Sequence, residues 1–269
     1  MPVADADLKF YLAASRPVAD TGTSGGALDP KMQLIDRTYA DAMNTGSGEQ
    51  VKLTSDSAAD TQNCTLMGYA PDGTWATETF ALTGVTPKVS TNTYLHLVSL
   101  VLASDANGTI AVTGNTTAAA IHTIPIGEHG AARMFILAKA NASGGASKDL
   151  YEKVFVGNDH ASAAAIEAKV WLAQDAGAYL TMDCEMSGDV TLTGGSETTA
   201  NRVTEPSTGG TYSWGEHASE GAAHAAGDAE DGNLAADEWQ GVWIKLTLAA
   251  GLTPDQDTQW QPAISAVAT

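Results

Sequence analysis

The chain has 269 residues, 43% of them hydrophobic, and this length can form one large all-β domain or two smaller ones. Its 13 basic and 32 acidic residues give a formal net charge of −19, which disfavours binding to nucleic acid or to an anionic membrane. No signal-peptide pattern and no apolar run of about 18 residues occurs, so we expect a chain made in the cytoplasm with no membrane span.

The first section combines one strand pattern with two flexible segments. DLKFYLA, residues 7–13, predicts a strand with alternate apolar side chains on one face. The Gly/Ser-rich TGTSGGALDP, residues 21–30, predicts a turn, and TYADAMNTGSGEQ, residues 38–50, a flexible link. A strand alone cannot form a domain, so we expect residues 7–13 to pair with a later strand.

Residues 50–117 carry short strand patterns separated by turn residues, at the spacing typical of a small sandwich or meander. Pro71-Asp72-Gly73 predicts a hairpin turn. Residues 95–102 form the most apolar run, which indicates a central strand covered on both faces. We interpret His96 within it as a packed residue, because no second metal ligand stands at a usable spacing.

Residues 151–171 read as two strands joined by a tight polar turn at Gly157-Asn158-Asp159. This pattern predicts a β-hairpin of a sandwich, around which we expect the rest of the chain to be organised. Residues 177–186 predict a further alternating strand.

The remainder of the chain has one long loop pattern and one strong strand pattern. Residues 187–236 read as a long, weakly structured segment of the kind that carries contacts rather than core. Residues 242–248 show the strictest alternation in the sequence. The tail, residues 261–269, predicts an edge strand or a fraying end.

The two cysteines, Cys64 and Cys184, lie far apart and each falls within a predicted strand. Their spacing is not that of metal ligands, and a disulfide framework would need a denser pattern. We therefore expect two buried free thiols.

One acidic segment is a candidate calcium site. It supplies carboxylate and amide oxygens from Asp228, Glu230, Asp231 and Asn233, with Asp237 and Glu238 close behind. The spacing departs from the EF-hand pattern, because Glu230 and Gly232 occupy positions that need short oxygen ligands. The favoured interpretation is a solvated loop that binds no metal or other cofactor.

A hydrolytic site is the weaker of the chemical alternatives. Ser213, His217 and His224 could be a nucleophile and its bases, yet the G-x-S-x-G elbow is missing and the segment is rich in Gly and Ala. The sequence therefore predicts that the protein is not an enzyme.

Aromatic residues near the C-terminal end suggest an interaction surface. Tyr212, Trp214, Trp239 and Trp260 could form an exposed platform for a sugar or a protein. The competing interpretation is core and rim packing within a sandwich, which we favour.

Several stretches resemble a family of tailed-bacteriophage virion proteins. DLKFYLAASRPVADTGTSGGALD is similar to the family's first strand and Gly-Gly turn, and the segment from Val51 to Ala103 is similar to a repeated phage module. The module reads as T-S-x-x-x-x-D-T, a G-x-D-x-x-G hairpin, an E-T strand and a T-G-x-T-P turn. YEKVFVGNDHASAAAIEAKVWLA and GNLAADEWQGVWIKLTLAAG resemble later strands of immunoglobulin-like appearance. The motifs contain no catalytic residue.

The resemblance implies an all-β fold, an immunoglobulin-like β-sandwich with an inserted small β-domain. We expect residues 1–45 and 124–269 to form the discontinuous sandwich, and residues 46–123 the insert. The implied function is a virion structural protein, foremost a decoration or cement protein on the outer head surface. The alternatives are a tail or baseplate component and a carbohydrate- or receptor-binding module. The implied partners are the major capsid protein or tail proteins, together with further copies of the chain.

Overall fold

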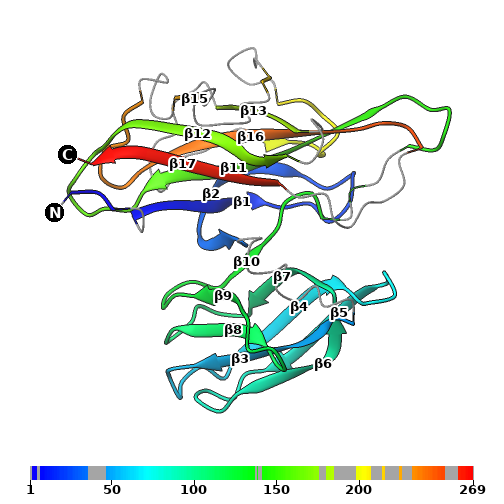
Figure 1. The fold of residues 1–269 in the computed structure, drawn as a ribbon, viewed down its shortest axis with the longest axis vertical. Helices are drawn as coiled ribbons and strands as arrows, with labels where there is room; N and C mark the ends of the chain where they lie inside the picture. Colours follow the sequence, from blue (N-terminus) through cyan, green and yellow to red (C-terminus); the bar gives the residue numbers. More distant parts are fainter. Residues whose placement is uncertain are drawn as a thin grey trace. The chain divides into compact units, whose positions relative to one another are not determined.

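The computed structural model divides the chain into two compact units (Figure 1). Unit 1 comprises Met1–Asp29 and Met134–Thr269, and unit 2 is the single segment Pro30–Arg133. Unit 2 is therefore inserted into the chain of unit 1, with crossings after Asp29 and after Arg133. The structure describes residues 2–4, 7–35, 47–136, 138, 141–175, 180–184, 198–206, 214–215, 224–225, 232–251 and 260–268.

The described residues form an all-β protein without an α-helix. None of them belongs to a helix that is long and apolar enough to cross a membrane. The observed division places residues 30–45 and 124–133 with the inserted segment, next to residues 46–123.

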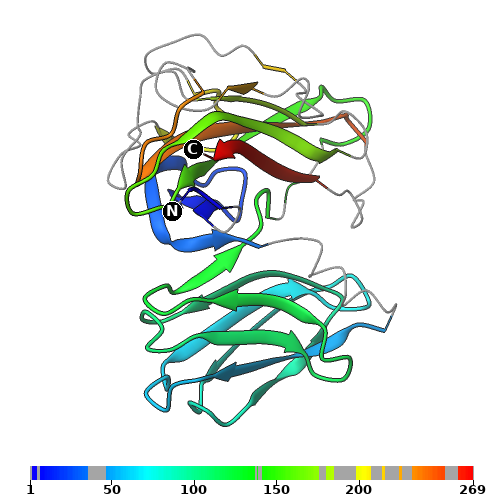
Figure 2. The same ribbon diagram turned by 60° about the vertical axis from the view of Figure 1, so that its left-hand side comes forward.

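Unit 2 is built from two facing sheets (Figure 2). In the first sheet the order is the end of β2, then β10, β7, β4 and β5; in the second it is β6, β3, β8 and β9. The bounds are β3 (Glu49–Ser55), β4 (Asn63–Tyr69), β5 (Trp75–Ala81), β6 (Lys88–Tyr94), β7 (His96–Leu102), β8 (Ile110–Gly114), β9 (Ala120–Ile124) and β10 (Gly130–Ala132).

The core of unit 2 lies between these sheets. Leu66 and Leu100 from the first sheet pack with Leu53, Val112 and Ile121 from the second, and each is fully or almost fully buried. Strand alternation explains the arrangement, because every second side chain of a strand points to the same face. The predicted central strand is confirmed, since β7 is buried and lies between β4 and β10.

The predicted hairpin at Pro71-Asp72-Gly73 is also confirmed. Tyr69 of β4 pairs with Trp75 of β5, and Gly73 has a φ of 78°, which glycine adopts readily. The Asp72 carboxylate accepts a hydrogen bond from the Thr74 N–H at 3.0 Å, as expected for a turn residue of this type.

Unit 1 contains a larger sheet and a smaller one. The larger has the order β13, β16, β11, β1 and β2, with β14 also paired to β2; the smaller has the order β15, β12 and β17. The bounds are β1 (Leu8–Ser15), β2 (Ser24–Leu34), β11 (Lys148–Asn158), β12 (Ala165–Asp175), β13 (Leu180–Cys184), β14 (Thr198–Thr199), β15 (His224–Ala225), β16 (Glu238–Leu248) and β17 (Trp260–Ala268).

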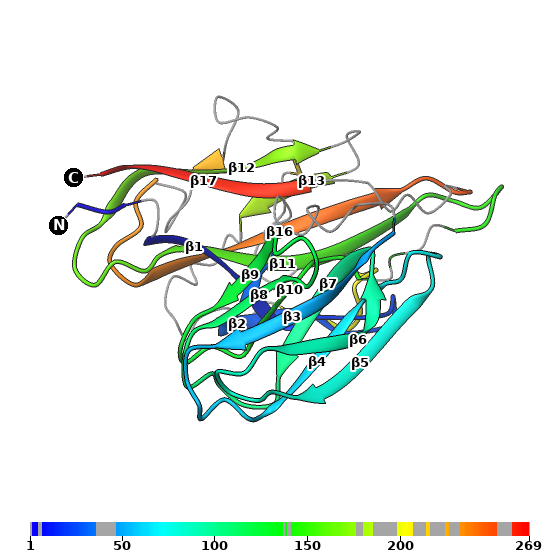
Figure 3. The same cartoon turned by 60° about the horizontal axis from the view of Figure 1, so that its bottom comes forward.

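The two sheets of unit 1 form separate layers (Figure 3). β12 and β17 run together in one layer, and β11 and β16 in another. Within the larger sheet, β1 pairs with β11, and Tyr11 and Ala13 pack with Leu28, Phe155 and Trp239. Both units are thus sandwich-like all-β structures.

The predicted hairpin of residues 151–171 is wrong, although both of its strands form. β11 pairs with β1 and β16, whereas β12 pairs with β15 and β17, so the polar turn joins two different sheets. Asn158 explains this corner, because its side-chain amide donates to the carbonyls of Ala163, Leu234 and Ala235 at 2.8–3.2 Å. The polar residues stabilise a passage between layers rather than a reversal within one.

The turn predicted for residues 21–30 is wrong from Ser24 onward, where β2 begins. Gly25 and Gly26 have φ values of 89° and 87°, so the glycines allow an irregular strand start rather than a turn. The predicted link at 38–50 lies largely outside the described residues. The predicted tail strand is confirmed, because β17 pairs with β12 and lies at the end of the smaller sheet.

Candidate functional site

A buried arginine in unit 1 anchors the segment that follows β14. β14 pairs with the start of β2 through Thr198 and Thr199. Three residues later the Arg202 N–H donates to the Gly22 carbonyl at 3.0 Å, and the Arg202 carbonyl accepts from the Tyr151 N–H at 2.7 Å. The Arg202 residue is fully buried, so its guanidinium must find its partners inside the unit.

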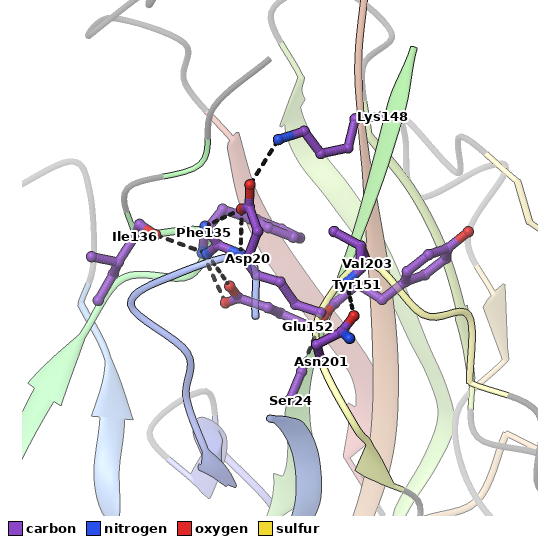
Figure 4. Close-up of polar contacts among 10 residues, drawn as sticks. Asp20, Ser24, Phe135, Ile136, Lys148, Tyr151, Glu152, Asn201 and Val203 are labelled. Atoms are coloured by element: carbon purple, nitrogen blue, oxygen red, sulfur yellow. Dashed lines mark hydrogen bonds and ion pairs between the residues drawn. The ribbon is translucent and has the colours of Figure 1, made fainter. Parts of the chain in front are cut away.

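The Arg202 guanidinium binds two carboxylates and one carbonyl (Figure 4). It donates to Glu152 at 3.1 Å, to the Ile136 carbonyl at 2.8 Å and to Asp20 at 2.9 Å. Lys148 also binds Asp20, at 2.7 Å. We call Asp20, Lys148, Glu152 and Arg202 the Arg202 cluster; it contains two cationic and two anionic side chains.

The two carboxylates of the Arg202 cluster differ in their environment. Burial raises the pKa of Glu152 to about 7, and this effect outweighs the N–H of Phe135, which donates at 2.8 Å, and the charge of Arg202. Burial also acts to raise the pKa of Asp20, but the hydrogen bonds from Lys148 and Arg202 outweigh it and hold that pKa below its usual value.

The contacts of the Arg202 cluster connect four segments that are distant in sequence. Asp20 lies before β2, Glu152 and Lys148 lie on β11, Ile136 follows the second crossing, and Arg202 follows β14. Charge-assisted hydrogen bonds of this kind fix geometry strongly when they are buried. The arrangement therefore acts as a clamp on the backbone of unit 1.

Unit 2 uses carboxylates in a different way. The buried Asp60 accepts from the Asn107 N–H at 2.7 Å, the Gly108 N–H at 3.0 Å and the Ser55 hydroxyl. Glu49 similarly accepts from the N–H groups of Thr116 and Thr117. In both cases burial acts to raise the pKa of the carboxylate, but the hydrogen bonds hold it below its usual value. These groups fasten loops to neighbouring strands.

The candidate calcium residues lie mostly outside the described residues. This applies to Asp228, Glu230 and Asp231, while Asn233 is exposed. Glu238, next to this segment, accepts a hydrogen bond from the Ala235 N–H. Among the residues that the structure describes, there is no cluster of three His, Cys, Asp or Glu side chains able to hold a metal ion.

The four aromatic residues do not form one exposed platform. Trp239 is fully buried, with its ring 5.0 Å from that of Tyr11, so its assignment to an exposed surface is wrong. Apolar residues on both faces of β16 explain the burial. Tyr212 and the side chain of Trp260 lie outside what the structure describes, as do Ser213, His217 and the side chain of His224.

Trp214 is half-buried and makes three contacts within unit 1. Its ring lies 5.4 Å from that of Tyr151 and 5.1 Å from the Lys245 ammonium, and its N–H donates to Glu205 at 2.6 Å. Burial raises the pKa of Tyr151, as do the nearby negative charges of Asp149 and Glu205. Trp214 therefore braces its segment against β11 and β16.

Cys64 is a buried free thiol, as expected from the sequence, and burial raises its pKa to about 12. The side chain of Cys184 lies outside the described residues.

Sequence reasoning missed the Arg202 cluster and an aromatic pair on unit 2. The segment around Arg202 gives no signal for burial, because it reads as a polar loop. The pair consists of Tyr69 and Trp75, whose rings lie 5.2 Å apart at 78°. Their positions on either side of a predicted hairpin turn could have indicated that they face each other.

Comparison with protein-family models, curated proteins and solved structures found no match for the chain.

Proposed function

We propose that the chain is a non-enzymatic structural protein of a tailed-bacteriophage particle, acting as a decoration protein on the outer surface of the head. The observation that carries the proposal is the way buried polar groups are used: Arg202, Glu152 and Asp60 bind other parts of the same chain. Polar groups that satisfy one another stabilise a scaffold, whereas a catalytic group must keep an atom available to its substrate.

The net charge supports an outer position. A chain of net charge −19 is repelled by packaged DNA, so the outside of a shell suits it better than the inside. Many copies on one shell would stabilise it through multivalency, even if each copy made only modest contacts. The partners in this proposal are the major capsid protein and further copies of the chain.

The proposal extends to the fold of unit 1. Two stacked β layers with Trp239 buried against Tyr11 suit an immunoglobulin-like sandwich, which is the fold that the resemblance to virion proteins implies. A sandwich of this kind offers flat faces for assembly without requiring a pocket.

The test is to locate the chain in purified particles. Mass spectrometry of particles should detect it at many copies, and cryo-electron microscopy should place it on the outer surface of the head. Density on the tail would support the tail-component alternative instead. A chain that is absent from particles, or that lies inside the shell, would overturn the proposal.

A further inference from the structure

One face of the β4–β5 hairpin carries only uncharged side chains. In β4, Cys64 and Leu66 point into the core of unit 2, so the alternate residues point outward. The pairing register places three β5 residues opposite them: Thr65 with Thr79, Met67 with Thr77, and Tyr69 with Trp75. We call these six residues the β4–β5 face. Thr77 and Thr79 are exposed, and the other four are half-buried.

The lack of charge on this face contrasts with the rest of the protein. The chain carries 32 acidic residues, yet β4 and β5 contain only one charged side chain, that of Glu78. Glu78 belongs to the opposite side of β5 and accepts from the Thr91 N–H at 2.7 Å and the Asn92 N–H at 2.8 Å. An uncharged face costs less free energy to remove from water than a charged one.

The hairpin is held in a defined shape. The hydroxyls of Thr65 and Thr79 lie 2.9 Å apart, and the rings of Tyr69 and Trp75 make an edge contact. Gly68 allows close packing beneath them, because a side chain there would meet the His96 carbonyl at 2.2 Å. A surface that is already ordered loses less conformational entropy on binding.

We propose that the β4–β5 face is the surface through which unit 2 binds the shell protein of the particle, at a patch that is itself uncharged and partly apolar. This inference rests on the proposed function. Tyr, Trp and Met are enriched in the buried centres of protein interfaces, and the face holds one of each.

The chemistry of the face also selects the partner. A charged partner group would be left unpaired against the β4–β5 face, at a large cost in free energy. The rings of Tyr69 and Trp75 are inclined by 78°, so they do not make the coplanar platform on which a flat sugar chain would lie. An uncharged protein surface fits both observations.

The experiment adds the full chain to purified particles that lack it and measures the affinity by co-sedimentation. Thr77→Glu places a carboxylate in the middle of the face, beside Met67, and should weaken binding by roughly tenfold or more, because the charge would be buried without a partner. Thr123→Glu is the matched control, since Thr123 is an exposed threonine of β9, which lies at the edge of the other sheet. It should bind as the unaltered chain does.

A second substitution of opposite sign separates burial from simple repulsion. Thr77→Lys should weaken binding to a similar extent; stronger binding would mean an acidic partner and would overturn the proposal. Equal binding by all variants would overturn it as well, while leaving the chain in the particle and the proposed function intact. Loss of self-association or of glycan binding in Thr77→Glu, with particle binding unchanged, would assign the face to another occupant. If Thr77→Glu fails to fold, Thr79→Glu replaces it.

Discussion

The two units solve the same structural problem with different chemistry. Unit 2 has five basic and nine acidic residues, a net charge of −4, whereas unit 1 has eight and 23, a net charge of −15. In unit 2, single carboxylates such as Asp60 accept hydrogen bonds from loop N–H groups. In unit 1, Arg202 connects two carboxylates and a carbonyl. Loops that offer N–H groups need only an acceptor, while carbonyls and carboxylates need a buried cation.

Removal of Arg202 should have the largest effect. Arg202→Met leaves Glu152 buried without its cation, so we expect unit 1 to lose about 3–5 kcal/mol of unfolding free energy. Urea unfolding followed by hydrogen exchange of the β11 amides measures this loss. The β4 amides of unit 2 report whether the effect stays within unit 1.

Arg16→Met is the matched control in the same unit. Arg16 pairs with Asp29 at 3.0 Å but is partly exposed, so its removal should cost only about 1 kcal/mol. An equal loss in the two variants would contradict the view that burial gives Arg202 its importance.

The units should respond to pH in opposite directions. Burial raises the pKa of Glu152 from 4.5 to about 7, so folded unit 1 binds a proton more readily than the unfolded chain. Its stability should therefore fall as pH rises from about 4.5 to 7, by roughly 3 kcal/mol. Glu152→Gln should abolish this dependence, and a slope that survives the substitution would contradict the assignment.

Unit 2 should lose stability on the acidic side instead. The folded-state pKa values of Asp60 and Glu49 lie below their usual values of 3.8 and 4.5, so their contribution is present above this range and is lost as pH falls through the lowered values. Unfolding curves of the β4 amides between pH 2 and 7 would check this. A loss of unit 2 stability above pH 5 would contradict it.

Asp60→Ala should destabilise unit 2 by about 2–3 kcal/mol, because buried donors including the Gly108 N–H lose their acceptor. Thermal unfolding with exchange of the residues 103–109 amides measures both the loss and its location. Asp60→Asn retains an acceptor oxygen and should recover part of the stability.

An exposed ion pair in unit 2 should matter least. Lys31 and Asp105 lie in contact, but both side chains are more than 40% exposed. Lys31→Met should therefore change the unfolding free energy by no more than about 1 kcal/mol, and less at high salt. A change as large as that of Arg202→Met would remove the distinction between buried and exposed charges.

Local patterns in the sequence predicted individual strands but not their partners. The apolar run of β7 and the turn at Pro71-Asp72-Gly73 were sufficient, because burial and turn chemistry are local properties. Strands β11 and β12 were recognised, yet their alternation carries no information on which strand lies beside them. The corner at Asn158 depends on carbonyls from residues 234 and 235, far along the chain.

The Arg202 cluster was beyond the reach of sequence patterns for a related reason. Arg202 and Asp20 are separated by 182 positions, and neither lies in a motif that links them. The aromatic residues show the same limit, because Trp239 and Trp214 look alike in sequence but differ in burial. Burial of a polar or amphipathic side chain is decided by tertiary packing.

The insertion of unit 2 has a consequence for synthesis on the ribosome. Lys9 on β1 contacts Asp159, 150 positions later, so β1 emerges long before its neighbour β11 exists. Unit 2 is complete within one uninterrupted segment and can fold while β1 waits. The early formation of unit 2 would also shorten the effective loop that β1 must close to reach β11.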